Sequence, residues 1–226
     1  KKEKIKIIHS GIETGKEADK GLGKAFRREQ GIPEDHVVAG TVGALKKNKG
    51  YLTLMRSAAE AIRKHPNLTF CAAGSGKDGD LFQKEAQRLQ LGERFRFLGQ
   101  VDHLKPFYSG IDLFVLPSRN EGLGTSILDA QDYSIPVIAT DTGAVSEIVE
   151  QEVSGLLVPV GDTKALTAAI SKVVKDREYG RRLGRAGKEH VSSFSIEDTV
   201  EKYVELYKQL LIKNAPALKS RMGDTS

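Results

Sequence analysis

Two acidic residues stand on either side of a glycine-rich turn in the middle of the chain. Glu121 and Asp129 are separated by seven residues within the segment Leu116–Ala130, which ends an apolar run and leads into a predicted helix. Carboxylates accept hydrogen bonds from hydroxyl groups, which suits the recognition of a sugar or a ribose. Both carboxylates could face a cavity above the end of a strand. The alternative is a plain helix start, in which Asp129 caps Ser126 and Glu121 complements the helix dipole.

The same segment could also cradle a phosphate group. Gly122 and Gly124 would let the backbone approach a ligand closely, because glycine has no Cβ. The N–H groups of Thr125 and Ser126, at the start of the predicted helix, have no partner within the helix and would point at an anion. Such a site favours a negative charge by roughly 0.3–1 kcal/mol.

A lysine-rich turn follows an earlier apolar run, in the segment Gly40–Gly50. A lysine at the start of a helix opposes the helix dipole, so Lys49 indicates a nearby anion, and a diphosphate is one candidate. The alternative is a solvated, lysine-rich loop. That alternative suits Lys46 and Lys47 better than Lys49.

The segment Gly74–Gly79 has the glycine spacing of a dinucleotide-binding loop. In dinucleotide-binding enzymes that loop opens the first βαβ unit, and an acidic residue ends the next strand. Here the loop follows the second strand expected in the domain, and the next strand ends in Gly99 and Gln100 without an acid. NAD or FAD binding is therefore disfavoured. A P-loop is excluded as well, because Asp78 follows Gly76-Lys77.

These motifs lie at the ends of short apolar runs that alternate with amphipathic stretches. The alternation predicts βαβ units and therefore an α/β fold with a doubly wound, mostly parallel sheet of Rossmann-like type. Strands are expected over His36–Val42, Leu68–Ala73, Arg94–Leu98, Asp112–Leu116, Pro136–Ala139 and Gly155–Pro159. Helices or helical turns are expected over Tyr51–Lys64, Asp78–Leu89, Lys105–Tyr108, Ser126–Tyr133, Ala144–Val149 and Lys164–Val174.

The two ends of the chain are expected to differ from this domain. Further strands and helices are expected at Ile5–Ile8, Lys20–Gln30, Arg177–His190 and Ile196–Ile212, and the last of these carries an apolar stripe along one face. The expected divisions are a remnant strand and linker over residues 1–19, the α/β domain over 20–193, a C-terminal helix over 194–213 and a disordered tail over 214–226.

Composition narrows the class of protein. The 226 residues are 39% hydrophobic and 29% charged, which is typical of a globular domain, and they are too few for two complete Rossmann-type halves. No apolar run approaches the roughly 20 residues that a membrane helix needs, and no secretory signal is evident, so a cytoplasmic location is expected. The single cysteine, Cys71, lies in a predicted buried strand, which fits a reducing compartment.

The net charge of +5 suggests an anionic partner. Nucleic acid is the weakest candidate, because the aromatic residues are not interleaved with the basic ones.

Together the motifs resemble the donor-binding domain of group 1 glycosyltransferases, the large retaining family with the GT-B fold, from about Lys4 to Ile212. The order and spacing of several short motifs carry the resemblance. They are Gly43-Ala44-Leu45, Lys49-Gly50, Phe97-Leu98-Gly99, Pro117-Ser118, Glu121-Gly122, the acidic pair, Pro136–Thr140 with Gly143 and Glu147, and Gly155–Val158. His9–Glu13 is similar to the segment that joins the two domains in that family.

The resemblance implies the C-terminal half of a GT-B fold and a site for a nucleotide sugar. Lys49 would bind the donor diphosphate, Glu121 the hydroxyls of the transferred sugar and Asp129 the ribose, and Lys49 and Glu121 would be the catalytic residues. The turn at Gly99 and Gln100 would lie beside the base. The donor-binding residues implied in this way are Gly43, Lys49, Gly74, Gly99, Gln100, Glu121, Gly122, Leu123, Gly124, Thr125 and Asp129.

Two positions depart from the family's pattern. Ala44 stands where an arginine is usual, and Asp129 replaces the usual glutamate, which shortens the reach to ribose by one methylene. Lys46 or Lys47 could replace the missing cation.

The resemblance also implies partners beyond the donor. An N-terminal acceptor domain would be missing, the acceptor would be a glycan or glycolipid, which could lie at a membrane surface, and no metal or other cofactor is expected. A sugar epimerase of the same fold and a non-catalytic nucleotide-sugar sensor are the alternatives.

Overall fold

A six-stranded parallel sheet forms the centre of the molecule. The computed structural model describes residues 5–222, with side chains described as far as Ile212. The strands follow the order β3-β2-β1-β4-β5-β6, and every neighbouring pair is parallel. Their bounds are β1 Val37–Val42, β2 Leu68–Ala73, β3 Phe95–Gly99, β4 Leu113–Leu116, β5 Val137–Thr140 and β6 Leu156–Val158. The predicted doubly wound α/β fold is therefore confirmed.

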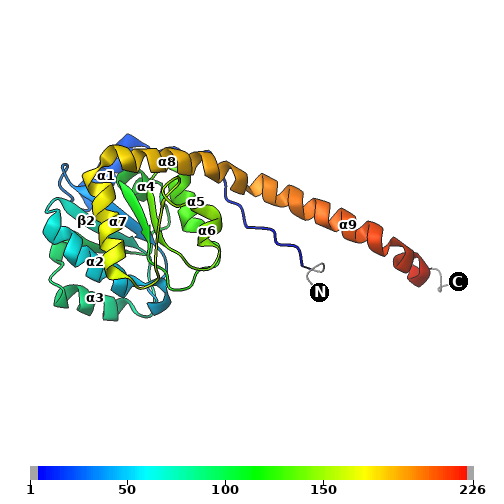
Figure 1. Ribbon diagram of the computed structural model, residues 1–226, viewed down its shortest axis with the longest axis horizontal. Helices are drawn as coiled ribbons and strands as arrows, with labels where there is room; N and C mark the ends of the chain where they lie inside the picture. The colour runs from blue at the N-terminus through cyan, green and yellow to red at the C-terminus, as the bar shows by residue number, and fades with distance from the viewer. Residues whose placement is uncertain (1–4, 223–226) are drawn as a thin grey trace.

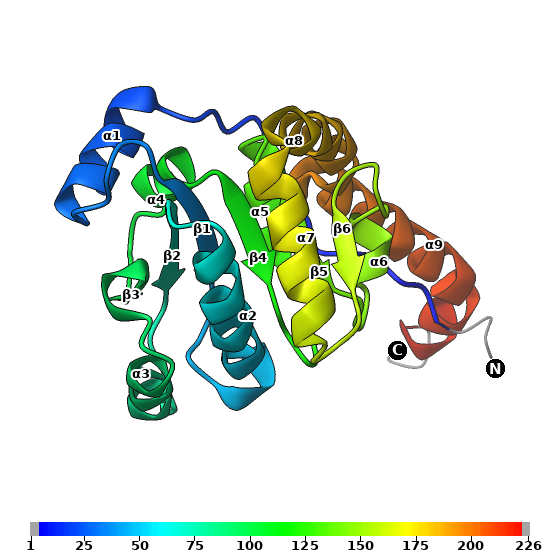
Figure 2. The same cartoon turned by 60° about the vertical axis from the view of Figure 1, so that its left-hand side comes forward.

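Helices cover both faces of this sheet (Figure 2). The helices are α1 Lys20–Glu29, α2 Tyr51–Lys64, α3 Gly79–Arg88, α4 Lys105–Gly110, α5 Thr125–Asp132, α6 Val145–Ile148, α7 Thr163–Lys175, α8 Arg177–Val191 and α9 Ile196–Met222. Side chains of α2, α3 and α7 join the core on one face, and side chains of α1, α4, α5 and α6 join the core on the other. Helix α8 packs along α5 and α7.

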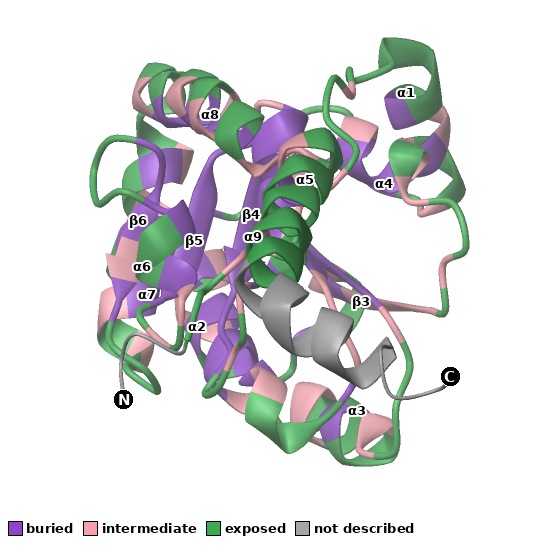
Figure 3. Cartoon of the chain, turned by 90° about the vertical axis from the view of Figure 1, so that its right-hand side faces the viewer, coloured by how far each residue is buried: buried purple, intermediate pink, exposed green. Residues whose placement is uncertain are grey.

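Alternation along the strands explains the two cores. In β1, Val37 and Ala39 belong to one core and Val38 to the other, because successive side chains of a strand point to opposite faces. Because helices cover both faces, these strands are apolar at nearly every position. This is why sequence analysis could predict them from short apolar runs. Figure 3 shows most of the strands as buried, while β3 is largely of intermediate burial. The predicted strands and helices of this region all form, with bounds that shift by up to two residues.

The chain order creates a topological switch point between the central strands β1 and β4. From β1 the chain builds outward through β2 and β3, and it then returns to place β4 on the other side of β1. The loops after β1 and β4 therefore both lie above the carboxyl ends of two adjacent strands. Ligands of open α/β sheets bind in the crevice at such a point.

The N-terminal segment differs from its prediction. Residues 5–10 form no strand, and Ile5 and Ile7 are 74% and 77% exposed. An apolar run becomes a strand only where another strand offers its edge, and this segment runs away from the sheet (Figure 1). Instead, Ile12 makes a backbone bridge to Ser195, at the junction before α9.

The C-terminal helix is longer than expected. Helix α9 continues to Met222, so the predicted end at Ile212 and the predicted disorder from Asn214 differ from the structure, and residues 223–226 lie outside the described part. Extending a helix that already exists costs far less than starting one. Helix α9 projects from the domain (Figure 1), and its predicted stripe includes exposed side chains such as Val200, Tyr203 and Tyr207. None of the helices within residues 5–222 is long and apolar enough to cross a bilayer.

Candidate active site

Two loops meet at the switch point, one after β1 and one after β4. The backbone N–H of Arg119 donates to the carbonyl of Asn48 at 2.8 Å. Beside this bond Gly50 has a φ of +72°, and a Cβ on it would lie 1.7 Å from the carbonyl oxygen of Pro117. Only glycine allows so close a backbone approach. The contact fixes the lysine-rich turn against the loop that carries Glu121.

Lys49 and Glu121 form an ion pair between these loops. Lys49 Nζ donates to Glu121 Oε2 at 2.7 Å, and the hydroxyl of Ser118 donates to the same oxygen at 3.0 Å. The side chains of Lys49 and Glu121 are 27% and 14% exposed, so the pair is neither fully buried nor freely solvated. The structure thus gives Lys49 an anion at the start of α2, although the anion here is a carboxylate. Ser118 is fully buried, and sequence reasoning assigned it no role.

A third loop, after β5, packs against the backbone of Glu121 and Gly122. Gly143, in the loop after β5, has a φ of +59°, and a Cβ on it would lie 1.8 Å from the carbonyl oxygen of Glu121. The N–H of Ala144 donates to the carbonyl of Gly122 at 3.0 Å. The backbone on both sides of the Glu121 carboxylate is therefore held by close contacts.

Helix α5 begins immediately after this loop. Gly124, with a φ of +80°, occupies the N-cap position, and no side chain caps the helix. The alternative in which Asp129 caps Ser126 is therefore wrong. Around Gly122 the space is open, since no atom lies within 4 Å of where its Cβ would be. Thr125 is exposed, whereas Leu123 packs against the core below. The helix start is thus arranged as a backbone N–H site that a ligand could approach.

The glycine-rich loop after β2 forms the wall of a neighbouring hollow. A Cβ on Gly74 would lie 2.1 Å from the carbonyl oxygen of Gly43, and the N–H of Gly74 donates to the carbonyl of Gly99 at 2.7 Å. Close backbone packing therefore accounts for the first glycine of this loop. Gln100 accepts a hydrogen bond from Ser75 at 3.4 Å. The hollow measures about 260 Å³ and is lined by Val42, Gly43, Ala44, Ala73, Gly74, Ser75, Gln100, Val101 and Leu104.

Asp129 lies at a second hollow of about 460 Å³, which shares Leu104 with the first. Its partner is Lys16, whose Nζ lies 2.8 Å from Asp129 Oδ1. Glu121 and Asp129 thus face different lysines. Sequence reasoning missed Lys16, because it lies 113 positions from Asp129 in a segment interpreted as a linker.

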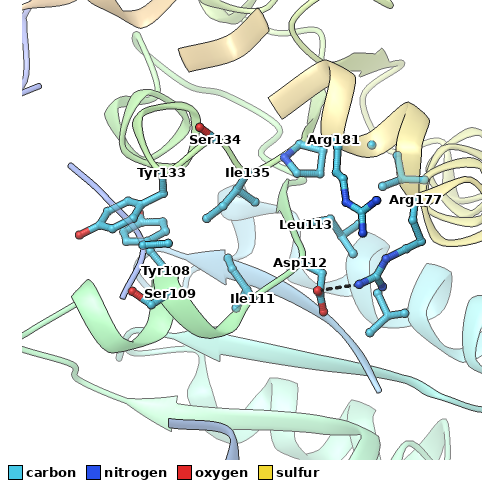
Figure 4. Close-up of a pocket in the computed structure, with 15 residues that line it drawn as sticks. Tyr108, Ser109, Ile111, Asp112, Leu113, Tyr133, Ser134, Ile135, Arg177 and Arg181 are labelled. Carbon is cyan, nitrogen blue, oxygen red and sulfur yellow. Dashed lines mark hydrogen bonds and ion pairs between the residues drawn. The ribbon is translucent and has the colours of Figure 1, made fainter. Parts of the chain in front are cut away.

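A third hollow, of about 180 Å³, lies at the opposite ends of the strands (Figure 4). Its wall includes Asp112, which precedes β4 and pairs with Arg177 at 2.9 Å and Arg27 at 2.7 Å. Asp112 also accepts the N–H of Val38 at 2.7 Å. These contacts tie α1 and α8 to the sheet, so we interpret this hollow as structural. Among the side chains described, those of residues 5–212, no three of His, Cys, Asp or Glu gather in a way that could hold a metal ion.

The fold and the switch-point site define a Rossmann-like α/β domain of GT-B type. Residues 24–190 match the family "Glycosyl transferases group 1", and the chain belongs to that family. It is similar to the D-inositol 3-phosphate glycosyltransferase of Corynebacterium jeikeium, with 34% identity over 81% of this chain and 46% of the relative. It is also similar to the lipopolysaccharide core biosynthesis glycosyltransferase LpsE of Rhizobium meliloti, with 30% identity over 91% of this chain and 58% of that relative.

Solved structures show the same fold. HepE from Anabaena, in complex with UDP and glucose, matches with a TM-score of 0.85 at 22% identity. The match covers 90% of this chain and 57% of the HepE chain. Sucrose-phosphate synthase from Thermosynechococcus elongatus matches with a TM-score of 0.78 at 31% identity. That match covers 92% of this chain and 53% of the synthase chain. The chain therefore spans about half the length of the relatives that it matches.

Proposed function

We propose that this chain is the half of a retaining glycosyltransferase that binds the nucleotide-sugar donor. The observation that carries the proposal is the pair Lys49–Glu121, which joins the two loops at the topological switch point at 2.7 Å. A nucleotide sugar has an anionic diphosphate and a sugar with hydroxyl groups, and an adjacent cation and carboxylate could bind these two parts. The diphosphate needs positive charge, and the sugar offers hydroxyl donors to a carboxylate.

Each residue then has a chemical task. Lys49 would neutralise the diphosphate as the bond to the sugar breaks, and the N–H groups at the start of α5 would help to stabilise the charge that develops on it. Glu121 would accept hydrogen bonds from the sugar and hold its anomeric carbon in place. Asp129 would take the ribose, and the base would lie near Gly99 and Gln100. No step in this scheme requires a metal ion.

Transfer itself would need a second wall for the cleft. Holding the acceptor hydroxyl near the anomeric carbon, away from water, can supply roughly 7–11 kcal/mol of the barrier. We expect that wall to come from an acceptor domain, as the match to about half of each relative suggests. The isolated chain should therefore bind the donor without transferring the sugar. Because one side of the cleft is open, we expect a Kd for the donor in the high micromolar range. This corresponds to a binding free energy of about 5–6 kcal/mol.

The acceptor and the location are part of the same proposal. LpsE is named for lipopolysaccharide core biosynthesis, and a glycan or glycolipid acceptor fits that likeness. The net charge of +5 would favour an anionic membrane surface, so we propose a cytoplasmic protein that works at the inner face of the membrane in bacterial polysaccharide or glycolipid synthesis.

Thermal unfolding of the chain with UDP-, GDP- and ADP-sugars tests the proposal. A ligand at 100 times its Kd adds about 2.7 kcal/mol of stability, so one of the three should raise the melting temperature clearly. Lys49→Ala should abolish this shift. Lys64→Ala is the matched control, because Lys64 is exposed at the far end of α2, about 20 Å along the helix.

The same experiment can overturn the proposal. A wild-type chain that ignores all three nucleotide sugars, or equal shifts in wild type and Lys49→Ala, would contradict the assignment. Sugar transfer by the isolated chain would also contradict it. Conversion of the sugar without an acceptor would point to an epimerase, and binding without any reaction in a protein that includes the second domain would point to a sensor.

A further inference from the structure

Lys16 is held from several sides, although its segment has no regular secondary structure. The N–H groups of Gly15 and Lys16 donate to the buried carboxylate of Asp132 at 3.1 and 2.8 Å. The carbonyl of Lys16 accepts a hydrogen bond from Lys188 Nζ, on α8, at 2.8 Å. All these contacts use the backbone of residues 15 and 16. They therefore fix the position of residue 16 whatever its side chain is.

The fixed backbone aims the Lys16 side chain at Asp129. Lys16 Nζ lies 2.8 Å from Asp129 Oδ1, and each side chain is 29% exposed. Asp129 and Asp132 are three residues apart on α5, so they lie on the same side of the helix. A lysine on a free surface loses much side-chain entropy when it forms an ion pair, and the pair then contributes little. The Lys16–Asp129 pair is partly buried, so salt and solvent screen it less than such a surface pair.

The ion pair borders the 460 Å³ hollow together with two tyrosines. The rings of Tyr108 and Tyr133 stack 5.1 Å apart at 13°, and Figure 4 shows them side by side. The Tyr108 hydroxyl is buried and has no hydrogen-bond partner within the described residues. Burial, and next the charge of Asp129, raise the pKa of Tyr108. A neutral hydroxyl donor and a carboxylate acceptor thus border one hollow.

We infer that Lys16 is a positioning residue for ribose recognition. It holds Asp129 through Oδ1, so that Oδ2 is aimed at the hydroxyls of the donor's ribose. The two interactions are compatible, because an ionised carboxylate has about four lone-pair sites on its two oxygens. The inference rests on the proposed function, since it assumes that a nucleoside diphosphate occupies the site. It gives a role in donor binding to the segment before α1. This role is separate from that of the Lys49–Glu121 pair.

Calorimetric binding to the full chain tests this inference. UDP, GDP and ADP are titrated first, and then the 2′-deoxy and 3′-deoxy forms of the one that binds most tightly. Hydrogen bonds to a charged group imply a preference for the ribose form of roughly tenfold or more in the wild type. In Lys16→Met we expect this preference to fall to about twofold or less, because the carboxylate is no longer aimed.

Two further variants separate positioning from other effects. Lys16→Arg should restore most of the preference, since it returns a cation to Asp129. Lys64→Met is the matched control and should keep the preference of the wild type. Lys64 is exposed at the end of α2 and does not line this hollow. A merely structural role for Lys16 would weaken the ribose and deoxyribose forms equally.

Several outcomes would overturn the inference. An unchanged preference in Lys16→Met would remove Lys16 from ribose recognition. Tighter binding of the ribose form in that variant would mean that Lys16 competes with ribose for Asp129. A wild type that binds a nucleoside diphosphate without preferring ribose would refute the inference and leave Lys49 and the diphosphate site intact. A wild type that binds none of the three would instead refute the proposed function.

Discussion

The ammonium of Lys49 lies 2.7 Å from a carboxylate oxygen of Glu121, although the two residues are 72 positions apart in the chain. The structure thus holds a charge pair where the proposed donor would place its diphosphate and sugar. A bound diphosphate would share Lys49, and Glu121 would then turn toward the sugar. Four predictions examine this site and the core that supports it.

Replacing Glu121 with glutamine should separate sugar recognition from diphosphate binding. The amide keeps the size of the side chain but removes its charge, so Lys49 is left free for the diphosphate. We expect affinity for the nucleoside diphosphate to be unchanged or higher, while the affinity added by the sugar falls by about 1.5–3 kcal/mol. Calorimetry with the two ligands measures the difference.

Glu178→Gln is the control for Glu121→Gln. It removes a carboxylate of α8 that pairs with Arg181 and Arg185. Equal losses for both ligands in Glu121→Gln would count against the assigned role of this residue.

An alanine at Gly50 should disturb the whole site, because its Cβ would lie 1.7 Å from the carbonyl oxygen of Pro117 at a φ of +72°. We expect a loss of about 1–3 kcal/mol of unfolding free energy, measured by urea denaturation, together with loss of nucleotide binding. Gly122→Ala is the comparison, since nothing lies within 4 Å of its Cβ position, and its stability should change by about 0.5 kcal/mol or less. Similar stability in the two variants would show that the two loops are not held as tightly as the contact implies.

Introducing arginine at Ala44 should tighten diphosphate binding. Ala44 lines the 260 Å³ hollow in the same loop as Lys49, so a guanidinium there could reach the same anion. A charge-assisted hydrogen bond would contribute about 1.5–3 kcal/mol. Ala44→Gln, which adds length without charge, should give a much smaller gain in calorimetry. No gain with arginine would indicate that Lys46 or Lys47 already supplies that charge.

The thiol of Cys71 should make the protein less stable at high pH. Burial raises the pKa of Cys71 from 9.0 to about 12, so the unfolded thiol ionises before the folded one does. Its contribution to stability is complete below pH 9 and is lost as the pH rises toward 12. The slope for one such group approaches 1.4 kcal/mol per pH unit.

Urea denaturation between pH 9 and pH 10 should therefore show a steeper fall for the wild type than for Cys71→Ala. The comparison uses slopes, because alanine also changes packing. Burial raises the pKa of Tyr51 as well, but it does so in both proteins. Parallel curves would mean that the thiol already ionises in the folded protein.

Local sequence patterns were enough to predict most elements of the α/β domain. Strand β2 occupies Leu68–Ala73 and helix α2 occupies Tyr51–Lys64, both as predicted, because hydrophobic periodicity and turn residues are local signals. The same local signals marked Lys49 as a cation in need of an anion and Glu121 as a carboxylate beside a flexible turn. The order and spacing of the motifs resembled those of group 1 glycosyltransferases, and this resemblance indicated the family.

Which of these residues meet depends on the folded chain. Sheet order brings the loops after β1 and β4 together, and with them Lys49 and Glu121. No local pattern indicates that Lys16 reaches Asp129, since that pair depends on how the N-terminal segment crosses α5 and α8. The segment at Ile5–Ile8 failed as a predicted strand for the same reason: an apolar run specifies a face to bury, and only the folded chain supplies a partner for it.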